Sequence, residues 1–159
     1  MIFDNKIKKL SKIIILFIIL CLFSNGNINK MSKISFKKSS LSEKFKNYFF
    51  IGAAINKDQI LQKDKKSISI IKKNFNTLSP ENVMKWMFIQ PKPKTFYFDD
   101  SDKYVQFGLD NNMHVVGHAL IWHSQIADFM NSIKDSTIMM EHVSNHISTI
   151  VNRYKGKVD

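Results

Sequence analysis

Two apolar stretches of this chain each lead directly into a cluster of polar and aromatic side chains. Phe75 and Leu78 precede residues 79–86, Ser-Pro-Glu-Asn-Val-Met-Lys-Trp, and Val115 precedes residues 117–125, Gly-His-Ala-Leu-Ile-Trp-His-Ser-Gln. Short apolar runs of this kind are typical of buried strands in a parallel sheet, whose carboxyl ends carry the functional groups. The sequence therefore predicts two consecutive parallel strands with polar groups at one edge, an arrangement typical of a (β/α)₈ barrel.

Strand and helix patterns alternate along residues 48–159. We expect strands at 48–54, 75–79 and 113–121, and a helix over 58–73 with a lysine-rich outer face. A second helix should begin near Asp100 or Ser101 and end at a left-handed Asn112. Asp135 or Ser136 should cap a third. The expected inward positions are Tyr104, Val105, Phe107 and Leu109 in the second helix, and Val143, Ile147, Ile150, Val151 and Tyr154 in the third. The alternation predicts an α/β fold with helical crossovers.

Glu81, Asn82 and Lys85 offer a carboxylate, an amide and an ammonium within a few residues. Such groups can hold vicinal hydroxyls through charge-assisted hydrogen bonds. The alternative is a helix start, with Pro80 at its first position and Glu81 in its first turn. The residues alone favour neither interpretation.

Two histidines, His118 and His123, flank Trp122, and Gln125 follows them. Positions five apart on a strand point to opposite faces, and neither Cys nor a carboxylate lies at ligand spacing, so we expect no metal site. Trp122, with polar neighbours, is suited to stacking on a sugar ring, whereas a purely structural place in the core is an alternative for Trp86. The two histidines could also be hydrogen-bonded core residues, an interpretation that fits His123 better. His114, His142 and His146 have surface contexts, and we assign them no role.

These two segments resemble those of glycoside hydrolase family 10 endo-1,4-beta-xylanases. The family has Thr-Pro-Glu-Asn-Glu-Met-Lys-Trp after its second strand and Arg-Gly-His-Thr-Leu-Val-Trp-His-Ser-Gln on its third. This chain departs at Val83, Val116 and Ala119 and keeps the polar residues. The runs 50–54 and 96–98 also match, so the resemblance covers residues 48–159.

The resemblance implies a (β/α)₈ TIM barrel and a retaining hydrolase that acts through two carboxyl groups. Binding of xylan or a related beta-1,4-linked polysaccharide on the non-reducing side of the cleaved bond would fall to Glu81, Asn82, Lys85, His118, Trp122 and Gln125, with Trp86 and His123 supporting them. No cofactor or metal is implied.

A complete barrel of this type needs about 250 residues, and this chain has 159. We expect an incomplete barrel: the first three β/α units and the start of a fourth strand near Val158. The resemblance places both catalytic Glu residues, the acid/base and the nucleophile, beyond Asp159. The chain alone is therefore expected to be an inactive N-terminal fragment.

The net charge of +11 lies mostly in the first 47 residues, which carry ten Lys against Asp4 and Glu43. The apolar run 13–23 follows four of these lysines and has the length of a secretory h-region rather than of a membrane span. We expect a signal peptide or membrane anchor at 1–26, a lysine-rich linker at 27–47 and the barrel domain at 48–159, in a secreted or surface-anchored protein. A lone Cys21 excludes an internal disulfide.

Two other functions fit parts of the sequence. A truncated, non-catalytic xylan-binding protein would use the same residues, although an open sheet edge disfavours it as a stable unit. A basic module that binds nucleic acid or a membrane surface would depend on residues 1–47 and on low salt. We expect no nucleic-acid partner, and membrane contact only through residues 1–26.

Overall fold

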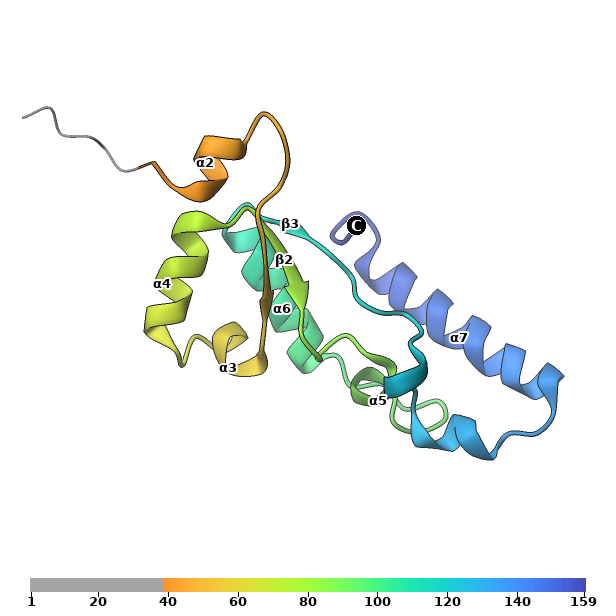
Figure 1. The fold of residues 1–159 in the computed structure, drawn as a ribbon. Coiled ribbons are helices and arrows are strands. Elements are labelled where there is room, and N and C mark those ends of the chain that lie inside the picture. Colours follow the sequence, from red (N-terminus) through yellow and green to blue (C-terminus); the bar gives the residue numbers. More distant parts are fainter. Residues whose placement is uncertain (1–38) are drawn as a thin grey trace, which may run out of the picture. The chain divides into compact units, whose positions relative to one another are not determined.

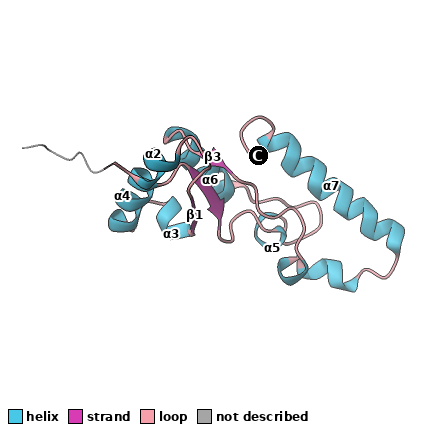
Figure 2. Ribbon diagram, turned by 45° about the horizontal axis from the view of Figure 1, so that its top comes forward, coloured by secondary structure: helices cyan, strands magenta, loops and turns pink. Residues whose placement is uncertain are grey.

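The computed structural model describes residues 39–159, which contain a three-stranded parallel sheet with helices packed around it (Figures 1 and 2). The strands are β1 (Gly52–Ile55), β2 (Thr77–Pro80) and β3 (His114–Val115), in that order across the sheet. The helices are α2 (Leu41–Phe45), α3 (Lys57–Ile60), α4 (Lys65–Asn74), α5 (Trp86–Ile89), α6 (Asp99–Asp110) and α7 (Ser136–Tyr154), with 3₁₀ turns η1 (His123–Gln125) and η2 (Asp128–Ser132). The strand–helix order is that of the first three units of a (β/α)₈ barrel, as predicted.

The predicted signal peptide or anchor at 1–26, and most of the linker at 27–47, lie outside the described residues. Both stay predictions, as does a secreted or surface location. Within the described part of the linker, α2 forms a short helix that the sequence pattern did not predict. Across residues 39–159, none of the helices combines the length and hydropathy that a membrane crossing requires.

Pro80 stops the ladder between β2 and β3. Thr77 pairs with His114 and Leu78 with Val115, and the Val116 N–H donates to the Leu78 carbonyl at 2.9 Å. The next bond would run from the N–H of residue 80 to the Val116 carbonyl, and proline has no N–H. We predicted a strand over 113–121, but β3 ends at Val115 for this reason, and the following residues are free to leave the sheet.

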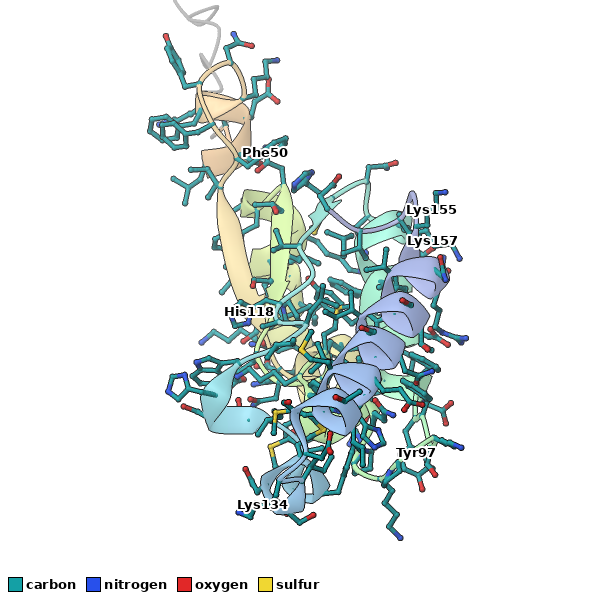
Figure 3. All side chains as sticks on the ribbon, turned by 90° about the vertical axis from the view of Figure 1, so that its right-hand side faces the viewer. Phe50, Tyr97, His118, Lys134, Lys155 and Lys157 are labelled. Atoms are coloured by element: carbon teal, nitrogen blue, oxygen red, sulfur yellow. The ribbon has the colours of Figure 1, made fainter. Side chains whose placement is uncertain are left out.

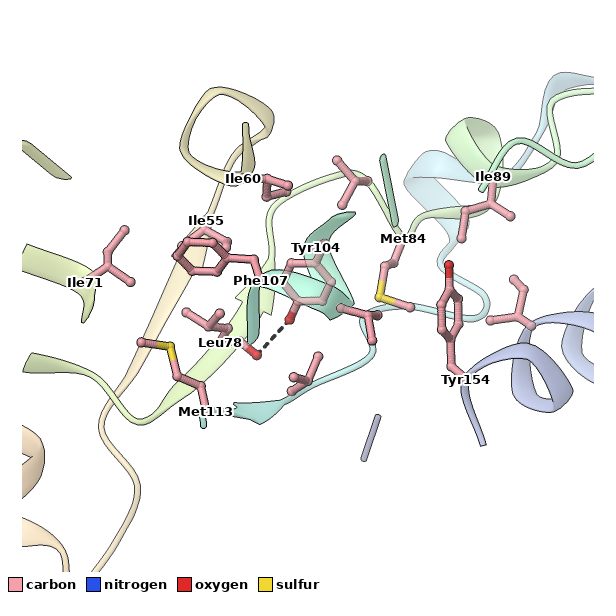
Figure 4. Packing of buried hydrophobic residues seen from close by; sticks show 14 of the residues in the cluster. Ile55, Ile60, Ile71, Leu78, Met84, Ile89, Tyr104, Phe107, Met113 and Tyr154 are labelled. Carbon is pink, nitrogen blue, oxygen red and sulfur yellow. Dashed lines mark hydrogen bonds between the residues drawn. The ribbon is translucent and has the colours of Figure 1, made fainter. Parts of the chain in front are cut away.

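The hydroxyl of Tyr104 takes the place of the missing donor. Its oxygen lies 2.9 Å from the Val116 carbonyl and 2.9 Å from that of Leu78. Because Leu78 already accepts the Val116 N–H, the tyrosine proton is needed at Val116. Tyr104 is fully buried beneath the sheet, and this burial raises the pKa of its phenol. Figure 4 shows the ring within the hydrophobic core.

A fourth strand begins beside β3, as predicted. The Asp159 N–H donates to the Val115 carbonyl at 2.9 Å, and the Asp159 carbonyl accepts the Gly117 N–H at 3.0 Å. This pair of bonds brackets Val116 in the parallel pattern. Asp159 therefore adds the first residue of a fourth strand next to β3.

The first crossover contains two helices where the sequence pattern predicted one helix over 58–73. Asn56 and Gln59 form a capping box on α3, and Gln62 adopts a left-handed φ of 56°. Asp64, which the pattern placed in the helix, instead caps α4 through the Ser67 N–H. Two capping residues so close together divide the segment, since each favours a helix start.

The second crossover helix, α6, begins at Asp99, one residue before the predicted start, and its N-cap is Phe98. Asn112 has the predicted left-handed conformation, with φ 52°. The prediction for Leu109 was wrong: its side chain is 40% exposed. The inward position belongs instead to Gly108, where a Cβ would lie 2.4 Å from Val115 Cγ2, so the absence of a side chain lets α6 approach β3 closely.

Asp135 caps α7, as predicted, by accepting the Thr137 and Ile138 N–H groups. Near the end of α7, Arg153 makes a bidentate ion pair with Asp102 of α6, and the Tyr154 hydroxyl lies 2.8 Å from Ser101 Oγ. The hydrogen bond from Arg153 holds the pKa of Asp102 below its usual value. These contacts join α7 to α6 and leave Val151, a predicted inward residue, 48% exposed.

The middle of α7 is joined to α5 by His146, which we had placed on the surface. That prediction was wrong. Its ring is fully buried and stacks on Trp86 with 3.9 Å between the ring centroids and 7° between the planes. Nδ1 lies 2.9 Å from the Gln90 side-chain amide, and Nε2 lies 3.1 Å from the Leu120 carbonyl. Burial lowers the pKa of His146 to about 4, so the imidazole is neutral near pH 7.

Replacing Tyr104 by Phe should lower the free energy of unfolding by about 1–3 kcal/mol, because the Val116 carbonyl then loses its donor in a partly buried position. Chemical denaturation of the purified chain measures the loss. Tyr97→Phe is the matched control, since Tyr97 is 58% exposed and should change stability by less than about 0.5 kcal/mol. Equal effects of the two substitutions would contradict this role for Tyr104.

Stability should fall as the pH is lowered from about 6.5 to about 4. In that window the unfolded chain protonates His146 while the folded chain keeps it neutral, so protons favour unfolding. The loss should approach about 3 kcal/mol. Denaturation midpoints measured at intervals across this range test it. His146→Phe should flatten the slope and His142→Phe should not. Any contribution from Asp102 appears at lower pH, because its pKa lies below 3.8.

Candidate functional site

The segment after β2 turns sharply instead of continuing into a helix. Residues 81–85 form bends and turns, and α5 begins only at Trp86, with Lys85 as its N-cap. The interpretation in which Pro80 and Glu81 open a helix is therefore wrong, because Pro80 is the last residue of β2. The Glu81 N–H donates to the Ile55 carbonyl at 3.0 Å, which fixes the turn against the end of β1.

Three of the predicted site residues meet at the Asn82 side chain. Asn82 Oδ1 accepts a hydrogen bond from Lys85 Nζ at 3.0 Å and another from Gln125 Nε2 at 3.3 Å. Gln125 belongs to η1, beyond β3, so this contact joins the polar segments that follow two neighbouring strands. The sequence prediction that these segments lie together is confirmed for Asn82, Lys85 and Gln125.

Trp122 joins the same group through Lys85. The ammonium nitrogen of Lys85 lies 4.6 Å from the centroid of the Trp122 ring, a cation–π distance. The ring is 37% exposed, and the His118 ring lies beside it with 6.4 Å between centroids and 55° between planes. We call Asn82, Lys85, His118, Trp122 and Gln125 the polar cluster. Figure 3 labels His118 of this cluster.

Lys85 is the electrostatically unusual member of the polar cluster. Its side chain is only 8% exposed, and within the described residues no carboxylate forms an ion pair with it. Lysine is rarely this buried without an anionic partner, because the ammonium loses hydration. One amide oxygen and one aromatic face stabilise the ammonium. Its other N–H groups can donate to oxygen atoms of a ligand.

Glu81 and His118 line two different hollows. Glu81 and Asn82 line a hollow of about 800 Å³ that also reaches Lys57, Tyr97 and Lys103. His118 lines a smaller one of about 240 Å³, against Ile150 and Val158. The Glu81 side chain is exposed and hydrogen-bonds no other predicted site residue among residues 39–159.

Trp86 and His123, the two residues expected to support the site, differ in burial. Trp86 is 1% exposed, and its indole N–H has no hydrogen-bond partner within residues 39–159. His123 is exposed, and its ring meets the edge of Trp122 at 5.9 Å, so the core interpretation of His123 is wrong. Nor do three or more His, Cys, Asp or Glu side chains gather into a metal-binding group in the described part of the chain.

Sequence reasoning missed His146 and Gln90, which lie directly behind the polar cluster. His146 follows Val143 by three positions and precedes Ile150 by four, so helical spacing alone places it on the inward stripe. We had assigned it a surface context and no role. Gln90 carries no such signal, since it ends a four-residue helix.

Residues 40–159 match the family model described as "Glycosyl hydrolase family 10". A Dictyoglomus thermophilum beta-1,4-xylanase is 39% identical over 147 residues, which cover 92% of this chain and 40% of that protein. The Xylanibacter ruminicola endo-1,4-beta-xylanase A is 36% identical over 70% of this chain and 31% of its own length.

Solved xylanase structures also superpose on this chain. Native xylanase 10B from Thermotoga maritima superposes with a TM-score of 0.71 at 32% identity, over 76% of this chain and 38% of that one. Xylanase 10B from Thermotoga petrophila RKU-1, solved with xylobiose, gives a TM-score of 0.72 at 32% identity, over 77% and 38%. The chain thus spans between about three tenths and two fifths of the length of these relatives. On the family match and the shared fold, this chain belongs to glycosyl hydrolase family 10.

Proposed function

We propose that residues 79–125 form the part of an endo-1,4-beta-xylanase cleft that binds xylose units on the non-reducing side of the cleaved bond. The observation that carries the proposal is the buried Lys85 ammonium, held between the Asn82 amide oxygen and the face of Trp122, with no carboxylate paired to it among residues 39–159. Such an ammonium can donate to oxygen atoms of a ligand, and sugar hydroxyls supply such oxygens.

The other members of the polar cluster complement a pyranose. The exposed face of Trp122 offers an apolar surface for the ring, while the amides of Asn82 and Gln125 can donate to and accept from hydroxyls. The Glu81 carboxylate, at the entrance beside Asn82, accepts from a hydroxyl on a neighbouring sugar unit. The xylobiose-bound Thermotoga petrophila relative supports this choice of ligand.

Hydrolysis would require two carboxyl groups about 5–5.5 Å apart on either side of the bond. By the family resemblance, both lie beyond Asp159. We infer that residues 1–159 bind the polymer and that the chain alone does not cleave it.

Lys85→Met should weaken binding of xylotriose about tenfold or more, because a charged hydrogen bond to a hydroxyl contributes about 1.5–3 kcal/mol. Isothermal titration calorimetry measures the affinity, with melting curves to show that the variant is folded. Lys134→Met removes the charge of an exposed lysine and should leave the affinity unchanged. Equal affinities for all three proteins would argue against the site.

The purified chain should release no reducing sugar from xylan above the level of a buffer blank. The reason is that no described carboxyl pair flanks the polar cluster. Reducing-end assays over long incubation, with a full-length family xylanase as positive control, measure this. Steady release that scales with the concentration of the purified chain would overturn the proposed division of labour.

A further inference from the structure

The residues from Gly117 to Gln125 carry three members of the polar cluster and follow the end of β3. Strand pairing to β2 ends at Val116. His118, Leu120 and Trp122 are exposed. Contacts that other elements make to this segment therefore bear on whether His118 and Trp122 keep one geometry.

His146 supplies a contact at the centre of this segment. Its Nε2 lies 3.1 Å from the carbonyl of Leu120, midway between His118 and Trp122. The ring is held on the opposite side by Gln90, whose amide is 2.9 Å from Nδ1. The ring stacks on Trp86 with 3.9 Å between the ring centroids. Phe96 lies nearly parallel to it, with 6.4 Å between centroids.

The hydrogen-bond chemistry fixes the protonation of the ring. A backbone carbonyl only accepts, so the proton must lie on Nε2. In a neutral imidazole Nδ1 is then an acceptor. Gln90 satisfies it by presenting its NH₂ group, which a half-turn of the amide brings to the place of the oxygen. Burial of the ring, which keeps His146 neutral, agrees with this assignment.

We propose that His146 is a positioning residue of the sugar site: it donates from Nε2–H to the Leu120 carbonyl and so fixes the segment that presents His118 and Trp122. Trp86 couples the two halves of the site, because it stacks on His146 and directly follows Lys85 in sequence. One buried ring thus sets the position of the segment after β3 and contacts the segment after β2.

Two variants separate the hydrogen bond from the packing. His146→Phe keeps a flat ring against Trp86 and removes the donor. His146→Gln loses the stack but places an amide N–H near the position of Nε2. His142→Phe is the matched control, since His142 lies one turn earlier on α7 and packs on Phe129 instead.

Nitrogen-15 relaxation should show larger-amplitude backbone motion over residues 118–125 in His146→Phe, while α6 stays as rigid as in the unmodified chain. The xylotriose affinity should fall about tenfold or more. His146→Gln should restore most of both, and His142→Phe should change neither. Unchanged backbone motion over 118–125 in a folded His146→Phe variant overturns the proposal, as does a rise in motion spread evenly over residues 39–159.

The affinity readout rests on the proposed function, and the relaxation readout does not. If the unmodified chain binds no xylotriose, the proposed function fails and the relaxation data alone decide the role of His146. If His146→Phe does not fold, nitrogen-15 NMR of the unmodified chain decides. A ring proton on Nε2 that exchanges slowly at pH 7 is expected, and a ring protonated on Nδ1 would overturn the proposal.

Discussion

The missing N–H of Pro80 determines how the rest of this structure is arranged. Proline ends the ladder between β2 and β3 at the point where the Val116 carbonyl would accept its next bond, and Tyr104 supplies a hydroxyl there instead. Because the Tyr104 hydroxyl replaces the missing N–H, the Val116 carbonyl keeps a hydrogen-bond donor. The segments that follow β2 and β3 leave the strand geometry at the same level. Both polar segments begin immediately after that level.

Among residues 39–159, side-chain contacts join the two polar segments. Asn82 receives hydrogen bonds from Lys85 within its own segment and from Gln125 in the other. Behind them, His146 and Gln90 tie α7 and α5 to the Leu120 carbonyl. Side-chain contacts of this kind can set a more specific geometry than a strand allows, because each donor and acceptor has its own direction. This suits a site that must meet hydroxyls at fixed positions.

The packing of helices on the sheet explains how α7 comes close enough for this role. Gly108 lets α6 lie against Val115, and the Arg153–Asp102 pair with Tyr154 and Ser101 joins α7 to α6. The ion pair is partly exposed, so it contributes to alignment more than to stability. The buried Trp86–His146 stack is the apolar part of the same junction.

The sequence by itself determined the family, the order of strands and helices, and most members of the polar cluster. Apolar runs, caps such as Asp135 and motif spacing are local properties that survive without coordinates. Two predictions from the sequence were wrong: a single helix over 58–73 and a third strand that reaches residue 121. The outcomes depended on which of two caps prevailed and on the missing donor of Pro80. The burial of His146 was decided only by the tertiary structure, because a histidine becomes a core residue only where Gln90, Trp86 and a distant carbonyl converge to satisfy both ring nitrogens.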